Sequence, residues 1–353
     1  MNSRQIYVIG VNYKTTPIDI REQFNIELQD YGQTLSAMMK LEGVQECALL
    51  CTCNRTEIHV VTNQIMKDSE VIEKEFCRLK GIDLYKVKKY FNRYKGVNAI
   101  HHIIKVASGM DSMILGEDQI LGQFKKAYEI SMKQGTSKSV LNTLSRLAIT
   151  SSKKIKTRNI YLGKARSVAG RAINLLSDRF GDELKGKKVL MIGSGEMGQL
   201  VTKELIQLGV PNILMTKRNM GCVKENTAAD CGASYVDYAK RYDYMKDCDI
   251  IISATASPHY TVTRDLLDEY FIDSPKEHIL IDLAVPRDMD SSLKEKEGIE
   301  LIDVDDLNQL IPKEERHIKP MDMDFIQEQI DLHTEEFIRW YQKHNVYASK
   351  REE

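Results

Sequence analysis

The sequence lacks the features that would place the chain in a membrane or in an export pathway. Its 353 residues contain no apolar run close to the roughly 20 residues that a membrane-spanning helix needs. The N-terminus, MNSRQIYVIGVN, enters a strand pattern directly and shows no signal-peptide layout. We therefore expect a cytoplasmic protein without a membrane partner.

An excess of either charge is also missing. Lys and Arg number 50 against 51 Asp and Glu, and the net charge of −1 gives no global attraction to nucleic acid or membrane surfaces. A polyanionic partner would have to be held by a local basic patch. The lysine- and arginine-rich run over residues 133–166 is a candidate for contact with RNA phosphates. A solvated helix face is the alternative explanation of that run.

Paired cysteines are absent as well. The chain has seven cysteines but no export features, which indicates thiols rather than a disulfide framework. No CxxC pair occurs, and Cys51 and Cys53 have no companion pair at zinc-finger spacing. No metal site is predicted.

Hydrophobic periodicity divides the chain into three parts. Residues 1–156 combine an early strand and a hairpin over 41–61 with long helices beyond Val97, which predicts an α+β domain. Residues 165–308 alternate strands with helices, which predicts a doubly wound parallel sheet of the Rossmann type. Residues 309–353 predict a short helical tail. The predicted fold class is a multidomain α/β protein.

A glycine-rich turn lies between the first strand and helix of the second part. The strand KKVLMI leads into GSGEMG, and an amphipathic helix follows. In GxGxxG spacing the first glycine permits the tight turn, the second lets the backbone approach a pyrophosphate, and the third lets the helix pack on the strand. The helix amides then face the phosphates. The predicted cofactor-binding residues of this turn are Gly193, Ser194, Gly195, Glu196, Met197 and Gly198.

The end of the following strand indicates which dinucleotide binds. An NAD site usually carries an acid there for the ribose hydroxyl, whereas an NADP site carries a cation. This chain has Lys217 and Arg218 and no acid. Arg218 could form paired hydrogen bonds with a 2′-phosphate, supported by Lys217. We therefore predict NADPH as the cofactor.

The stretch CTCNR places thiols where two strands should only turn. A cysteine thiolate is a strong nucleophile near neutral pH, so a thiol beside a dinucleotide domain suggests thioester chemistry. Arg55 could favour the thiolate if the turn brings the two groups together. Physical reasoning alone does not separate Cys51 from Cys53, and either could be a small buried apolar residue.

Several segments resemble the glutamyl-tRNA reductase family, the NADPH enzymes that start tetrapyrrole synthesis by the five-carbon route. So many motifs in one order are not expected by chance, and they cover about residues 5–310. In chain order they are GVNYKTTPIDIRE (10–22), TCNRTEI (52–58), HIIKVASGMDSMILGEDQILGQ (102–123), GSGEMG (193–198), DLAVPRDMD (282–290) and DVDDL (303–307).

The resemblance implies a reaction. The enzyme would reduce L-glutamyl-tRNA(Glu) to glutamate-1-semialdehyde through a cysteine thioester and release the tRNA. This is the first step of 5-aminolevulinate synthesis by that route, and glutamate-1-semialdehyde aminomutase is an implied partner. Two alternatives stay open: a diverged paralogue that reduces another acyl donor or aminoacyl-tRNA, and a non-catalytic NADP-binding regulator. The retained Cys53, Arg55 and Ser112 count against the regulator.

The resemblance also assigns residues. Cys53 occupies the cysteine of TCNR and would be the nucleophile, whereas Cys51 falls where the family more often has serine and would be a spectator. His102 matches a histidine considered important for activity, and it could assist proton transfer. Arg55 would hold a substrate carboxylate. The implied substrate-binding residues are Thr52, Asn54, Arg55, Ser112, Glu117, Asp118, Gln119 and Gln123.

Three departures from the family pattern concern assembly rather than chemistry. Tyr13 stands where histidine is frequent, and residues 157–166 lack the usual acidic residue and spacing. The family continues into a C-terminal helical dimerisation domain, whereas this chain ends at Glu353. Most of that domain is therefore expected to be missing, which leaves a homodimer open.

Overall fold

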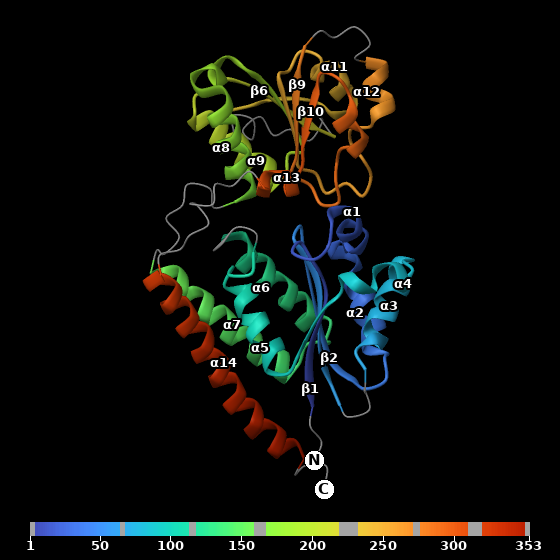
Figure 1. The fold of residues 1–353 in the computed structure, drawn as a ribbon, viewed down its shortest axis with the longest axis vertical. Helices are drawn as coiled ribbons and strands as arrows, with labels where there is room; N and C mark the ends of the chain where they lie inside the picture. Colours follow the sequence, from blue (N-terminus) through green and yellow to red (C-terminus); the bar gives the residue numbers. More distant parts are fainter. Residues whose placement is uncertain are drawn as a thin grey trace. The chain divides into compact units, whose positions relative to one another are not determined.

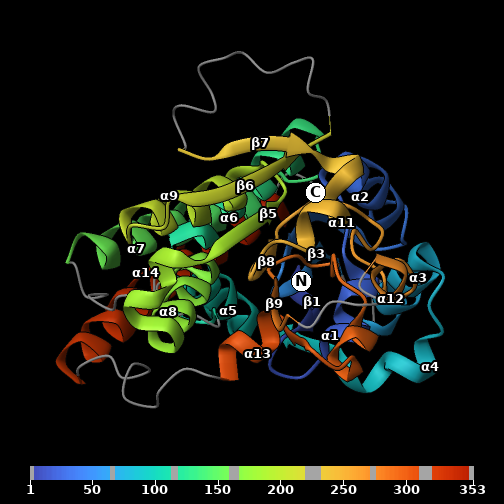
Figure 2. The same ribbon diagram turned by 90° about the horizontal axis from the view of Figure 1, so that it is seen from above.

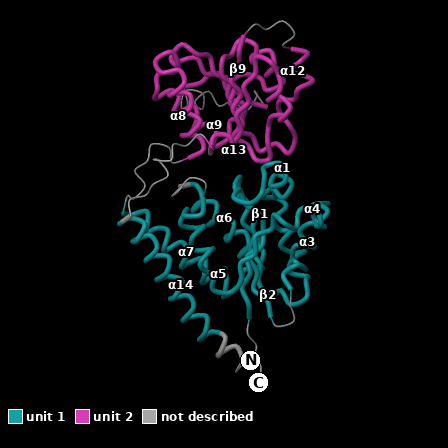
Figure 3. Tube along the Cα trace, viewed as in Figure 1, with its two compact units in different colours: residues 1–163, 313–353 teal, residues 164–312 magenta. Residues whose placement is uncertain are grey.

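The computed structural model describes seven stretches of the chain. They are residues 4–63, 68–112, 118–158, 167–218, 232–270, 276–309 and 320–349. The chain divides into two compact units (Figure 3). Unit 1 comprises residues 1–163 and 313–353, and unit 2 comprises residues 164–312. In the described residues no helix is long and apolar enough to cross a membrane.

Unit 1 is built on a four-stranded antiparallel sheet in the order β2-β3-β1-β4. Helices cover both of its faces, with α5, α6 and α7 on one side and α2, α3 and α4 on the other (Figure 1). The strands are β1 (Gln5–Asn12), β2 (Val44–Thr52), β3 (Arg55–Thr62) and β4 (Asn92–Lys95). The helices are α1 (Ile18–Arg21), α2 (Tyr31–Met39), α3 (Glu70–Lys80), α4 (Leu84–Val87), α5 (Val97–Ala107), α6 (Asp118–Lys133), α7 (Ser139–Thr157) and α14 (Pro320–Ser349).

The C-terminal tail belongs to unit 1 by its contacts. Helix α14 packs on α7 and α5. Its buried residues Ile326, Ile330 and Phe337 join the core that the sheet and its helices share. Spacings of four and seven residues put these three side chains on one helix face, so the core holds the tail through an apolar stripe.

Unit 2 is a six-stranded parallel sheet in the order β10-β9-β8-β5-β6-β7, and Figure 2 shows β7, β6, β5, β8 and β9 in succession. Its strands are β5 (Lys188–Ile192), β6 (Asn212–Lys217), β7 (Ser234–Asp237), β8 (Ile250–Ser253), β9 (His278–Asp282) and β10 (Ile299–Ile302). Its helices are α8 (Val168–Phe180), α9 (Glu196–Gln207), α11 (Arg241–Met245), α12 (Arg264–Tyr270) and α13 (Val304–Gln309). Strands β5, β8 and β9 are apolar and buried because helices cover both faces.

The fold confirms the predicted class: an α+β unit with an antiparallel sheet and a doubly wound parallel unit. Two strands lie outside the sequence-based expectation. Both β4 and β10 have four residues and lie at the edge of their sheets. Short edge strands carry little periodic signal, so only their pairing with β1 and β9 identifies them.

Helix α7 begins at a carboxylate from the sheet. Its N-cap residue, Lys138, makes no side-chain capping bond. Instead, the buried Glu46 of β2 accepts hydrogen bonds from the amides of Lys138 at 2.9 Å, Val140 at 3.0 Å and Leu141 at 2.9 Å. These amides have no partner within the helix, and the N-terminus favours negative charge. Glu46 therefore fixes α7 to the sheet.

We expect Glu46→Gln to destabilise the protein by about 2 kcal/mol, because an amide NH₂ would face backbone amides that now bond a carboxylate. Urea unfolding followed by circular dichroism measures this change. The matched control is Glu129→Gln on α6, which removes an exposed ion pair with Lys133. The control should change the free energy of unfolding by less than about 0.5 kcal/mol. Equal effects of the two substitutions would contradict the role given to Glu46.

Candidate active site

The predicted nucleophile lies at the tip of the β2–β3 hairpin. In the strand register Thr52 pairs with Arg55, so Cys53 and Asn54 alone form the turn. A two-residue loop holds its residues in a narrow conformational range. Cys53 is half-buried at this turn. The hairpin that the sequence predicts around TCNR is thus confirmed, and it ends in a thiol.

Backbone contacts from the chain after β1 fix the turn. The amide of Tyr13 donates to the carbonyl of Asn54 at 2.9 Å. The guanidinium of Arg21 is fully buried, and it donates to the carbonyl of Cys53 at 3.1 Å and to that of Thr16 at 3.0 Å. One cation thus joins the turn to the adjacent loop, so the backbone position of Cys53 is set by neighbours from both sides.

Beyond the turn, β3 carries a stripe of ionisable side chains. Arg55, Glu57 and His59 are spaced by two and therefore line one face of the sheet, the face covered by α5 and α6. All three are buried, with Arg55 only 1% exposed. Arg55 forms ion pairs with Glu57 at 2.7 Å and with Asp111 at 3.1 Å, and it also donates to the Asp111 carbonyl.

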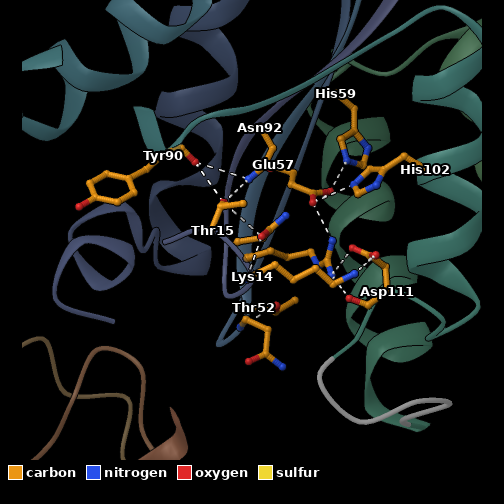
Figure 4. Close-up of polar contacts among 12 residues, drawn as sticks. Lys14, Thr15, Thr52, Glu57, His59, Tyr90, Asn92, His102 and Asp111 are labelled. Carbon is orange, nitrogen blue, oxygen red and sulfur yellow. Dashed lines mark hydrogen bonds and ion pairs between the residues drawn. The ribbon is translucent and has the colours of Figure 1, made fainter. Parts of the chain in front are cut away.

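Glu57 is the centre of this network (Figure 4). One of its oxygens is 2.7 Å from Arg55 and 2.9 Å from Nε2 of His102, a residue of α5. The other oxygen faces Nε2 of His59 at 3.4 Å, and Nδ1 of His59 lies 2.8 Å from the Tyr128 hydroxyl on α6. Glu57 therefore connects the sheet to α5 directly and to α6 through His59.

The network controls the charge of its members. Burial alone would raise the pKa of Glu57, but the charges of His102 and Arg55 outweigh that effect and hold the pKa well below its ordinary value. Burial lowers the pKa of His59, although its bond with Glu57 opposes the change. Glu57 is thus an anion at neutral pH.

His102 is held on two sides. Besides its bond to Glu57, its ring stacks on Tyr94 of β4, with ring centroids 3.9 Å apart and an interplanar angle of 13°. The side chain is 4% exposed. The structure thus places the predicted catalytic histidine within the Glu57 network.

A second cation approaches the network from the loop after β1. The half-exposed ammonium of Lys14 forms an ion pair with Asp111, the carboxylate that also bonds Arg55. Asp111 therefore lies between two cations. Burial opposes ionisation of Asp111, but Arg55 and Lys14 lower its pKa.

Cys51 has different surroundings from Cys53. Its thiol accepts from the Ile26 amide at 3.4 Å and lies 3.2 Å from Oδ1 of Asn25 and 3.3 Å from Oγ1 of Thr56. Burial raises the pKa of the Cys51 thiol, although the bonds with Thr56 and Ile26 and the charge of Lys80 oppose the rise. A thiol in this state is a poor nucleophile at neutral pH.

The predicted substrate-binding residues differ in their burial and in the elements that carry them. Thr52 ends β2 and accepts from the Asn54 amide at 3.2 Å. Ser112 is buried beside Asp111, whereas Gln123 is exposed on α6 and Gln119 is half-buried there. Asp118 begins α6. Glu117 lies outside the described residues, so the structure does not place it.

The side-chain oxygen of Asn54 is a buried hydrogen-bond acceptor without a partner among the described residues. The residue is 4% exposed. A buried acceptor left unpaired costs about 1–3 kcal/mol, so such groups commonly mark a place where a ligand donates. Asn54 belongs to the same two-residue turn as Cys53. A ligand donor that reached this oxygen would satisfy it.

In unit 2 the GSGEMG turn has the backbone that a dinucleotide requires. Gly193 has φ of 107°, and a Cβ there would lie 2.5 Å from the Ala254 carbonyl oxygen. A Cβ at Gly198 would lie 2.1 Å from the Gly193 carbonyl oxygen, whereas one at Gly195 would meet open space. Two glycines therefore permit close packing, and the third leaves the backbone open to a ligand.

Helix α9 starts at this turn and leaves its first amides available. Its N-cap, Gly195, makes no side-chain capping bond, and Glu196 and Met197 follow in the first turn. Ser194 precedes them. The amide of Gly193 donates to Oγ1 of Thr216 at 3.2 Å, which joins the turn to β6. Uncapped amides at a helix N-terminus are a suitable site for a pyrophosphate.

Lys217 and Arg218 lie at the carboxyl end of β6, beside that turn in the sheet order. The Lys217 ammonium lies 5.2 Å from the Tyr235 ring centroid, and the guanidinium of Arg218 lies 5.1 Å from that of Tyr238. Arg218 is exposed. These rings orient the two cations without neutralising them.

Reasoning from sequence missed several residues of the network, namely Lys14, Glu57, His59, Tyr94, Asp111 and Tyr128. Glu57 and His59 do show a signal, because RTEIH places charged residues at every second position of an expected strand. Such alternation normally indicates a solvent-facing side. Only the position of α5 and α6 shows that this side is buried.

The fold and the site together define an oxidoreductase class in which a dinucleotide-binding unit accompanies a unit with a positioned thiol. Residues 9–159 match the family model for the N-terminal domain of glutamyl-tRNA(Glu) reductase, and residues 174–310 match that for shikimate/quinate 5-dehydrogenase. The chain is 37% identical to a glutamyl-tRNA reductase of Clostridium novyi over 334 residues, covering 94% of this chain and 79% of that protein. The chain belongs to the glutamyl-tRNA reductase family.

Further relatives carry the same name. A glutamyl-tRNA reductase of Alkaliphilus oremlandii is 37% identical over 303 residues, covering 85% of this chain and 87% of that protein. Among solved structures, glutamyl-tRNA reductase from Methanopyrus kandleri aligns at 26% identity with a TM-score of 0.48, covering 98% of this chain and 82% of that one. The match to a dehydrogenase family over unit 2 agrees with a nicotinamide cofactor.

The different surroundings of the two thiols give a labelling prediction. Iodoacetamide reacts with thiolates, so at pH 7 it should modify Cys53 well before Cys51, whose raised pKa leaves less thiolate. Labelling of Cys51 should increase only at a pH above the pKa of an ordinary thiol, or after unfolding in urea. Peptide mass spectrometry of timed samples measures both rates. Equal rates for the two residues in the folded protein would contradict the assignment.

Proposed function

We propose that this protein is an NADPH-dependent glutamyl-tRNA reductase that converts L-glutamyl-tRNA(Glu) to glutamate-1-semialdehyde. The observation that carries the proposal is the two-residue turn that holds Cys53 two positions before Arg55, which is the first residue of a buried network of ion pairs. The family names of the relatives agree with this substrate. The proposal includes release of the tRNA and supply of the aldehyde for 5-aminolevulinate synthesis.

The chemistry begins at the thiol. The Cys53 thiolate attacks the ester carbon of glutamyl-tRNA, forms a thioester and displaces the ribose hydroxyl of the tRNA. When bound, NADPH supplies the hydride that reduces the thioester carbonyl. Collapse of the hemithioacetal on Cys53 then releases the aldehyde and restores the thiol. The reaction thus has two steps: thioester formation needs Cys53 of unit 1, and reduction needs the dinucleotide site of unit 2.

The residues around the turn bind and orient the substrate in this proposal. The open Oδ1 of Asn54 accepts a hydrogen bond from the glutamyl group, and Thr52 and Ser112 supply neutral hydrogen bonds. Arg55 already bonds Glu57 and Asp111, so we assign to it a positioning role that holds the turn, in place of direct contact with a carboxylate. His102 assists proton transfer, with Glu57 setting its orientation.

NADPH is the cofactor that we propose for unit 2. The residues that would hold it are the GSGEMG turn for the pyrophosphate and Arg218, with Lys217, for the 2′-phosphate. Neither Lys217 nor Arg218 at the end of β6 is an acid that would select NAD. Contact with aminomutase and a cytoplasmic location remain predictions from the sequence, which leaves a homodimer open.

The proposed reaction has a direct test. The protein, supplied with NADPH and glutamyl-tRNA, should release an aldehyde that reacts like glutamate-1-semialdehyde, whereas free glutamate should give no product. Cys53→Ser should abolish both the aldehyde and the covalent glutamyl-enzyme that mass spectrometry detects without NADPH. Cys51→Ser is the matched control and should keep the intermediate and most activity. Consumption of another aminoacyl-tRNA with glutamyl-tRNA intact would favour a diverged paralogue.

The cofactor proposal has a separate test. Arg218→Asp should weaken NADPH binding by about tenfold or more and reverse or abolish the preference over NADH, because a charge-assisted pair becomes a repulsion. Fluorescence titration of the free enzyme with each nucleotide measures this change. Lys246→Asp, which alters an exposed cation elsewhere in unit 2, serves as the control. Equal affinity of the unmodified protein for NADPH and NADH would refute NADPH selection.

A further inference from the structure

The loop that follows β8, residues 254–260, lies against the glycine turn. The Ala254 amide donates to the Ile192 carbonyl at 2.9 Å, immediately before Gly193. A Cβ on Gly193 would lie 2.5 Å from the Ala254 carbonyl oxygen and 3.1 Å from Cγ2 of Thr255. The start of this loop therefore packs directly on the turn that a pyrophosphate would occupy.

The strand order of the sheet indicates which half of a bound dinucleotide the loop would border. Strand β5, which leads into the glycine turn, lies between β6 and β8. The end of β6 carries Arg218, the residue that we assign to the adenosine 2′-phosphate. A dinucleotide crosses the carboxyl ends of the strands at this change of direction in the strand order. The loop after β8 therefore borders the nicotinamide half.

A single residue, Asp288, bonds both ends of this loop. Its carboxylate accepts from Ser253 Oγ at 2.6 Å and from the Thr255 amide at 2.7 Å, and it also bonds the Thr255 hydroxyl. Its carbonyl oxygen accepts from the amides of Thr261 and Val262, the latter at 3.0 Å. Asp288 is completely buried.

The middle of the loop is exposed. Pro258, His259 and Tyr260 are exposed, and the described bonds of Ser257 stay within the loop, to Thr255 and His259. Hydrogen bonds hold both ends of the loop: Thr255 bonds Asp288, and Thr261 bonds Asp288 and Arg241.

We propose that Asp288 is a positioning residue that sets the nicotinamide side of the cofactor site by holding the loop over residues 254–260 against the glycine turn. The proposal rests on the cofactor proposed above. It assigns to Asp288 no contact with the reacting atoms. The role is geometric, since each carboxylate oxygen accepts from groups at the start of the loop while the carbonyl holds the end.

The geometry distinguishes two substitutions of this residue. An asparagine can turn its amide oxygen toward Ser253 and the Thr255 amide and its NH₂ toward the Thr255 hydroxyl, which can accept. Asp288→Asn therefore keeps every bond to the loop and removes only the charge. Asp288→Ala removes the side-chain bonds and leaves the carbonyl in place. Thr255→Val removes both bonds of the Thr255 hydroxyl, the one that it donates to Asp288 and the one that it accepts from the Ser257 amide, and it opens no buried cavity.

Hydrogen exchange of the cofactor-free protein tests the loop, and fluorescence titration with NADPH tests the site. Asp288→Ala should increase deuterium uptake across residues 254–260 and weaken NADPH binding by about tenfold, whereas Thr255→Val should weaken it by about threefold. Asp288→Asn should stay within about twofold of the unmodified protein. The matched control is Asp290→Ala, which loses its bonds to Ser292 and to the Arg264 amide and none to the loop.

The outcomes separate the proposals. Formation of the glutamyl-enzyme at Cys53 without NADPH should be unchanged in all four variants. Unaltered exchange and affinity in Asp288→Ala would overturn the positioning role, as would an Asp288→Asn protein as impaired as the alanine variant. If Asp288→Ala does not fold, Thr255→Val decides by the same two measurements. Failure of the unmodified protein to bind NADPH would refute the cofactor, while exchange of the loop would still report on Asp288.

Discussion

The buried ion pairs of Arg55 are the interaction on which the catalytic unit depends. A guanidinium removed from water is tolerated only if its charge and its donors are satisfied, and removing one partner of such a pair usually costs several kcal/mol. Glu57 and Asp111 meet this need, and they come from the same strand and from the segment after α5. Glu57 also holds His102, and Asp111 also holds Lys14. The sheet, one covering helix and the loop after β1 are thus joined at the residue that follows the thiol turn.

This arrangement separates two cysteines that lie two positions apart. Cys51 pairs with Thr56, whose side chain lies on the opposite face of β3 from Arg55 and Glu57. Its thiol is enclosed by polar neighbours and its pKa is raised by burial. Cys53 lies beyond the last pair of the ladder, where the chain turns. Strand geometry alone therefore gives one thiol a structural environment and the other a place at the open end of the hairpin.

In unit 2, close backbone packing and hydrogen bonds join the elements around the glycine turn. Close packing at Gly193 and Gly198 brings the glycine turn against the loop after β8 and against α9. A side chain at either position would push these elements apart. Asp288 then fixes that loop by hydrogen bonds from its carboxylate and its carbonyl. In both units a buried ionisable side chain, Arg55 or Asp288, forms bonds with segments that are distant in the sequence.

The sequence by itself determined the class of both units, the hairpin turn and the glycine turn, because these features depend on local periodicity and on residues with special backbone freedom. It also indicated the two cations after β6. It did not determine that Arg55, Glu57 and His59 are buried, since alternation of charged and apolar residues fits a solvated strand equally well. Their burial depends on α5 and α6, and α5, the nearer of the two in the sequence, begins 35 residues after the end of β3. The tertiary structure alone decided that Arg55 bonds protein carboxylates and that Asp288 holds a loop some 30 residues away, because such pairings arise only when distant segments are packed together.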